Sequence, residues 1–141
     1  MTDGKLRESY TFLHLSNVIR YKSDVPLHLD GKLGDIQDIP SVLELPDETW
    51  ELTVHRQYVT ELCRKLKTLF PACHVHPDYD PIEPTSADIQ RFHSYDVAKW
   101  QKESAFFDRE QSMRDAWPTA AKYYNLRAKD IRSGAPAAAK I

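Results

Sequence analysis

The chain has 141 residues, of which 41% are apolar and 28% charged, and its formal net charge is -2. This length fits a single domain with a modest core, and the slight negative charge argues against non-specific binding of nucleic acid, which needs a basic surface. No apolar run approaches the roughly 18 residues that a membrane-spanning helix requires. We therefore expect a chain that is peripheral to a membrane at most.

Residues 5–22 carry two competing patterns. One apolar set has helical spacing, while another alternates as in a strand, and the segment is rich in aromatic and β-branched residues. Helix is favoured because no other stretch offers a good strand partner, and an isolated hairpin is only marginally stable in water. The helical set is Leu6, Tyr10, Leu13 and Val18 or Tyr21, and the alternating set is Leu13, Leu15, Asn17, Ile19 and Tyr21.

The stretch from Ser23 to Leu45 has no regular period and is punctuated by prolines and glycines. This composition predicts an irregular loop laid over the rest of the chain. A short turn of helix is expected at Pro40–Glu44, because proline suits the first helical position and Leu43 can pack against the helix that follows.

A long helix is predicted over Leu45–Phe70. Pro46 suits the first helical turn, Asp47 and Glu48 place negative charge at the positive end of the helix dipole, and Pro71 ends the helix. Two apolar rows recur at helical spacing, so this helix needs neighbours on two sides, and part of its surface is expected to meet a partner. One row holds Leu52, His55, Val59, Leu62, Leu66 and Leu69, and the other holds Trp50, Val54 and Tyr58.

Residues 71–84 hold four prolines, which predicts a stiff, extended connector. Thr85 with Asp88 three residues later is typical of a helix N-cap with a capping box. It opens a predicted helix over Ser86–Ala116, which would be about 45 Å long and too long for this chain to cover.

Trp117 precedes a proline and is therefore expected to interrupt the helix, which restarts as a short helix over Pro118–Asp130. The region after Trp117 is locally basic, with Lys122, Arg127, Lys129, Arg132 and Lys140 against a single acid, Asp130. The basic and aromatic residues at this end would support RNA binding. No nucleic-acid partner is expected for the chain as a whole.

Together these elements predict a mainly α fold, an extended helical protein with irregular, proline-rich connectors and no regular sheet. Its expected parts are a helical core segment over 1–70 with an irregular loop at 23–45, a connector over 71–84, a helical arm over 85–130 and a flexible tail over 131–141.

The candidates for metal binding are Cys63, Cys73, His74 and His76. Zinc accepts these ligand types, but a structural site normally adds a second, distant pair that this sequence lacks. The preferred interpretation is therefore a connector with surface histidines, two unpaired cysteines in a reducing compartment, and no cofactor. No spacing brings two titratable groups together for acid–base chemistry, so no catalytic residue and no enzymatic activity are expected.

Aromatic residues are the best candidates for a binding surface, because a small polar chain cannot bury all of them and because Trp and Tyr are the usual anchors of protein interfaces. The predicted interface residues are Trp50, Tyr58, Trp100, Phe107, Trp117, Tyr123 and Tyr124. Among these, Trp100, Phe107 and Trp117 are expected to pack chiefly against other chains.

The window from Leu45 to Pro71 resembles the small matrix-facing helical subunit of the mitochondrial cytochrome bc1 complex, and in part a helical accessory subunit of respiratory complex I. Both resemblances imply a non-catalytic structural subunit of a respiratory-chain assembly, on the matrix side of the mitochondrial inner membrane, with other subunits as partners. The alternatives are a structural protein of the ciliary axoneme or of cytoplasmic microtubules, and a small Cys/His metal-binding module. The matching residues are Leu45, Pro46, Asp47, Glu48, Trp50, Arg56 and Pro71.

Overall fold

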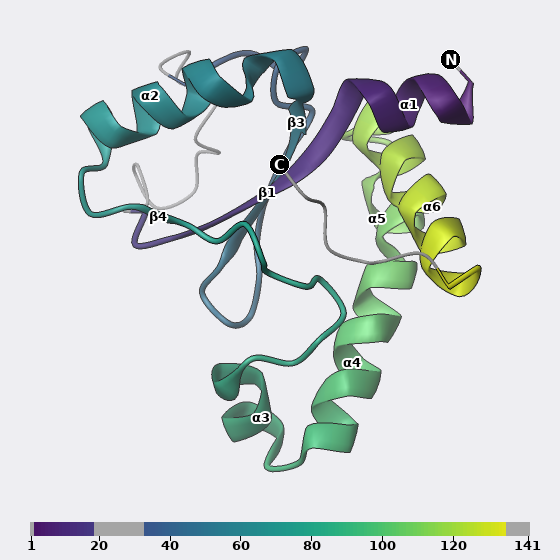
Figure 1. Cartoon of the computed structure of the whole chain (residues 1–141). Helices are drawn as coiled ribbons and strands as arrows, with labels where there is room; N and C mark the ends of the chain where they lie inside the picture. Colours follow the sequence, from purple (N-terminus) through teal and green to yellow (C-terminus); the bar gives the residue numbers. More distant parts are fainter. Residues whose placement is uncertain (1, 19–32, 135–141) are drawn as a thin grey trace. The chain divides into compact units, whose positions relative to one another are not determined.

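A computed structural model describes residues 2–18 and 33–134 (Figure 1). These residues form two compact units, which divide between Pro77 and Asp78. The first unit is built on a four-stranded antiparallel sheet, and the second is helical. The prediction of a mainly α fold without a regular sheet is therefore wrong, and the fold is mixed α/β.

The sheet has the strand order β2-β3-β1-β4, and every neighbouring pair is antiparallel. Its two central strands pair over six residues each, with Leu13 opposite Leu52 and His14 opposite Glu51. The strands are β1 (Tyr10–Ser16), β2 (Ser41–Glu44), β3 (Trp50–His55) and β4 (His74–Val75).

The predicted helix over Leu45–Phe70 is wrong in its first half, because its start signals belong to a turn. The backbone N–H of Thr49 donates to Asp47 Oδ1 at 3.0 Å, and Glu48 takes a positive φ of 67°. Proline and aspartate suit a tight turn as well as a first helical turn, so the LPDET stretch connects β2 to β3 instead of opening a helix.

Strand β3 follows that turn, because Trp50, Leu52 and Val54 alternate with polar residues and face one side of the sheet. A short 3-10 helix, η2 (Arg56–Tyr58), then leads into α2 (Val59–Leu69). The predicted end of this helix before Pro71 is confirmed.

The N-terminal prediction is correct only for α1 (Asp3–Ser9), where the side chain of Thr2 caps the helix by accepting from the Lys5 N–H at 3.2 Å. The following residues form β1, which is the alternating alternative and not the favoured helix. The strand partner that the sequence did not reveal, β3, lay inside the stretch assigned to a helix.

The predicted turn of helix at Pro40–Glu44 is also wrong, since Ser41–Glu44 is strand β2. Residues 19–32 of the predicted N-terminal helix and irregular loop, and 135–141 of the predicted tail, lie outside the described residues.

One face of the sheet packs against α2, whose Leu62 and Leu66 are buried there, and this contact forms the core of the first unit. The core residues contributed by the sheet and its flanking segments are Leu13, Leu15, Leu33, Ile39, Trp50, Leu52 and Val54.

In the second unit the predicted helix over Ser86–Ala116 is interrupted. It divides into α3 (Ser86–Phe92), α4 (Tyr95–Phe107) and α5 (Arg109–Met113). His93 ends α3 in a left-handed conformation with φ 56°, and the side chain of Ser94 starts α4 by accepting from the Val97 N–H at 3.3 Å.

Two local predictions in this unit are confirmed. The capping box between Thr85 and Asp88 is present in both directions, and the chain restarts as α6 (Pro118–Arg132) after the break at Trp117. Helix α6 packs against α5 and α4.

Candidate interaction surface

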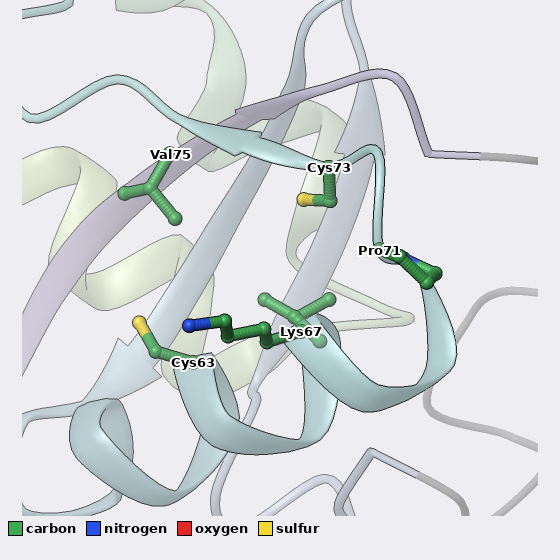
Figure 2. Close-up of a pocket in the computed structure, with 6 residues that line it drawn as sticks. Cys63, Lys67, Pro71, Cys73 and Val75 are labelled. Atoms are coloured by element: carbon green, nitrogen blue, oxygen red, sulfur yellow. The ribbon is translucent and has the colours of Figure 1, made fainter.

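The cysteines and histidines that the sequence brings together are separated by strand alternation. Cys73 and Val75 line a pocket of about 240 Å³ together with Cys63 of α2 (Figure 2). His74 lies on the opposite face of β4, because successive strand residues point to opposite sides. No group of three or more His, Cys, Asp or Glu residues that could hold a metal ion occurs in the described parts of the chain.

The remaining candidate ligand, His76, is used in another contact. Its Nε2 lies 2.6 Å from Ser16 Oγ, and its backbone N–H donates to the carbonyl oxygen of His14 at 2.8 Å. These bonds continue the pairing between β4 and β1. The metal-binding alternative therefore finds no assembled ligand set among the described residues.

The two thiols of the pocket are poor nucleophiles. Burial raises the pKa of the Cys63 thiol, and burial followed by the nearby Cys63 raises the pKa of the Cys73 thiol. Because the thiolate is the reactive form, a raised pKa lowers the reactivity of both residues near neutral pH.

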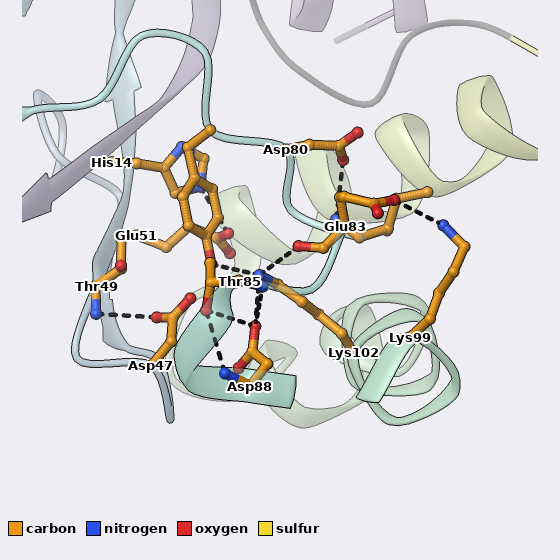
Figure 3. Close-up of polar contacts among 12 residues, drawn as sticks. His14, Asp47, Thr49, Glu51, Asp80, Glu83, Thr85, Asp88, Lys99 and Lys102 are labelled. Carbon is orange, nitrogen blue, oxygen red and sulfur yellow. Dashed lines mark hydrogen bonds and ion pairs between the residues drawn. The ribbon is translucent and has the colours of Figure 1, made fainter. Parts of the chain in front are cut away.

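A buried pair of hydrogen-bonded side chains joins the two central strands, and the sequence did not indicate it. His14 Nε2 lies 2.8 Å from Glu51 Oε2 across β1 and β3, and the side chains are 5% and 1% exposed (Figure 3). Neither group has surface to present to a substrate. The pair links β1 to β3 through their side chains.

In the second unit, Lys102 of α4 is the centre of a buried polar network (Figure 3). Its Nζ donates to the Tyr79 hydroxyl at 2.7 Å and to the Glu83 carbonyl oxygen at 2.8 Å, and it lies 3.1 Å from Asp88 Oδ2. Asp88 in turn accepts from the backbone N–H of Thr85 at 2.9 Å. The network ties α4 to the start of α3 and to the segment that precedes it.

A second lysine of α4, Lys99, lies partly exposed at the edge of the packed side. Lys99 Nζ lies 3.0 Å from Glu83 Oε2, and the Tyr95 hydroxyl donates to the same carboxylate. The hydrogen bond from Tyr95, followed by that from Lys99, holds the pKa of Glu83 below its usual range. Both lysines of α4 therefore lie on the packed side of the helix.

The opposite side of α4 is open. Trp100 is 65% exposed and Val97 is 44% exposed, while Ala98 and Phe106 on the packed side are 1% exposed. Trp100 is the most exposed of the large hydrophobic side chains among the described residues. Trp100 and Val97 therefore leave two large apolar side chains in water on one side of α4, which makes this side the candidate interaction surface.

The other predicted interface residues are less exposed. Trp50 is 8% exposed in β3, and Tyr123 and Tyr124 of α6 are 1% exposed each, which leaves them no surface for a partner. Of the aromatic residues in the basic C-terminal region on which the RNA-binding alternative depends, Tyr123 and Tyr124 are therefore buried and Trp117 is half-buried.

Three of the predicted residues are half-buried. The Tyr58 hydroxyl donates to the Leu33 carbonyl oxygen, Phe107 lies 4.4 Å beneath the guanidinium of Arg132, and Trp117 precedes α6. Of the seven predicted residues, Trp100 alone is mostly exposed. Sequence reasoning did not select Val97, although its spacing of three residues from Trp100 places both on one helix face.

Comparison of the chain with protein-family models, with curated proteins and with solved structures finds no match in any of the three. The window that resembles a helical respiratory subunit does not form a single helix, because residues 45–71 include a turn, β3, η2 and α2. None of the helices in the described residues has the length and apolar character that crossing a membrane requires.

Proposed function

We propose that this chain is a non-catalytic accessory subunit that binds a protein partner through the open face of α4. The observation that carries this proposal is Trp100, which is 65% exposed on a helix whose opposite side is fixed by buried contacts. Tryptophan is enriched among the few residues that supply most of the binding energy in protein interfaces.

The magnitude is sufficient for a specific contact. Covering the exposed part of the Trp100 indole removes roughly 150 Å² of surface from water, which stabilises a complex by up to about 4 kcal/mol at about 25 cal/mol per Å². The rigid mounting of α4 by Lys102 and Asp88 reduces the entropy that is lost on binding. A catalytic function has no comparable support among the described residues, because their strongest polar groups are buried in structural pairs.

The test is affinity capture of the full chain from its native source, comparing the parent with Trp100→Ala. We expect the variant to lose the main partner while its thermal unfolding is unchanged. The matched control is Ile36→Ala, which removes a 52% exposed apolar side chain from the first unit and should leave capture intact. Equal capture by all three proteins would show that α4 is not the binding surface.

The partner is predicted to belong to a mitochondrial respiratory-chain assembly on the matrix side of the inner membrane. The alternative is a partner in the axoneme or on cytoplasmic microtubules. The identities of the proteins lost with Trp100→Ala, together with cell fractionation, decide between these locations.

A further inference from the structure

The charged side chains of α4 are sorted between its two sides. Its only basic residues, Lys99 and Lys102, face the packed side and bind Glu83 and Asp88. Helices of small proteins usually turn lysine towards water, because its charged end is strongly hydrated. The open side of α4 is therefore left without a basic residue of its own.

The open side follows the spacing of a helix-packing stripe. Its members succeed one another at intervals of three and four residues, which aligns them along about 15 Å of helix. Acidic residues stand on both edges of this stripe, at the positions that face the edges of a second helix when two helices pack. The stripe consists of the exposed Val97 and Trp100 and the half-buried Ser104 and Phe107, with Asp96 and Glu103 on one edge and Gln101 and Asp108 on the other.

Two basic groups lie near this acidic border and moderate it. Lys99 Nζ is 3.5 Å from Glu103 Oε1, and the guanidinium of Arg132 covers Phe107 at the far end of the stripe. Asp96 and Asp108 are exposed, and neither forms an ion pair with another residue in the described part of the chain. The border is therefore acidic around Trp100.

A second copy of this chain is a poor occupant for the surface. If two α4 helices packed through this stripe, acidic edges would meet acidic edges in either the parallel or the antiparallel orientation, and like charges at these positions oppose association. A partner helix with lysine or arginine on its edges would gain attraction at the same positions.

We propose that the partner segment is an amphipathic helix of two to three heptads with basic residues on both edges of its apolar stripe. This inference rests on the proposed function, since it specifies what covers the open face of α4. Trp100 supplies the apolar anchor, and Asp96, Glu103 and Asp108 select the charge of the partner.

The test uses three fluorescent synthetic peptides of about 21 residues and fluorescence anisotropy with the full chain. The first peptide has a leucine stripe with lysine edges, the second has the same stripe with glutamate edges, and the third has the first composition in scrambled order. We expect the lysine-edged peptide to bind roughly tenfold or more tightly than the other two, and Trp100→Ala to weaken it by a similar factor.

Reversing the charge of the acidic border should reverse the preference for the lysine-edged peptide over the glutamate-edged one. The double variant Asp96→Lys, Glu103→Lys should bind the glutamate-edged peptide more tightly than the lysine-edged one. Because Glu103 contacts Lys99, the single variant Asp96→Lys provides a second test that leaves this ion pair intact, and it should reduce the preference for lysine edges by several-fold.

Four outcomes overturn the inference. The first is equal binding of the lysine-edged and scrambled peptides, which indicates non-specific charge attraction, and the second is no binding of the lysine-edged peptide. The third is self-association of the chain, provided that Trp100→Ala abolishes it. That result would show that a second copy of the chain covers the open face of α4. The fourth is native capture that depends on Trp100 but is unchanged in the double variant Asp96→Lys, Glu103→Lys; in that case the inference fails and the proposed function stands.

Discussion

Replacing Lys102 with methionine tests whether the buried polar network stabilises the packing of α4. Methionine keeps an unbranched side chain of similar length, so packing near the Tyr79 ring, which lies 4.4 Å from the ammonium group, is largely retained. The variant loses the charge and, with it, the polar contacts of Lys102 with Tyr79, Glu83 and Asp88.

The expected cost is about 3 kcal/mol of unfolding free energy. Removing one partner of a buried ion pair typically costs about 3–5 kcal/mol, and the side chains of Lys102 and Asp88 are only 11% and 8% exposed. We take the lower end because Asp88 keeps its hydrogen bonds from the backbone and side chain of Thr85. Urea unfolding followed by far-ultraviolet circular dichroism measures this loss.

Lys99→Met is the matched control, because Lys99 lies one turn away on the same helix and pairs with Glu83. Its side chain is 35% exposed and that of Glu83 is 45% exposed, so solvent screens the pair and the loss should stay below about 1 kcal/mol. Two results would refute this reasoning: an equal loss of unfolding free energy in both variants, or a Lys102→Met variant as stable as the parent. Either would show that the buried contacts of Lys102 do not stabilise the fold more than the exposed pair of Lys99.

Three further predictions concern the other titratable groups. The folded chain lowers the pKa of Glu83, so the stabilising contribution of this carboxylate is fully present above about pH 4.5 and is lost as the pH falls through the lower folded pKa. Glu83→Gln should therefore make the unfolding free energy less dependent on pH on the acid side. An unchanged pH dependence would contradict this prediction. Burial raises the pKa of the Cys63 and Cys73 thiols, so both should react with iodoacetamide more slowly in the folded chain than in urea near neutral pH. Mass spectrometry measures the two rates. Equal rates would show that folding does not protect the thiols. Glu51→Leu should cost about 2 kcal/mol in urea unfolding because a buried imidazole loses its hydrogen-bond partner. Adding His14→Leu should restore part of that loss, whereas additive losses would refute the pairing.

The sequence alone determined the features that depend on local chemistry. The capping box at Thr85 and Asp88, the end of α2 before Pro71 and the break at Trp117 are each fixed by residues within a few positions of one another. Hydrogen bonds from side chains to nearby backbone groups, and the restricted geometry of proline, act in the same way in any fold.

Only the tertiary structure decided that residues 50–55 form a strand. Trp50 and Val54 have helical spacing, and the same two residues with Leu52 between them have strand spacing, so the segment fits both periods. Strand pairing with β1 resolves the ambiguity, because Leu52 lies opposite Leu13, 39 positions earlier in the chain. A local pattern carries no record of such a distant partner.

The candidate surface shows the same division. Composition indicated that aromatic residues of the C-terminal half meet a partner, and it selected Trp100 together with Tyr123 and Tyr124. The structure buries the two tyrosines and exposes the tryptophan, because α6 turns its aromatic residues inward while α4 is held by its lysine side. Which face of a helix remains in water is set by the helices and segments packed against it, and that arrangement exists only once the chain has folded.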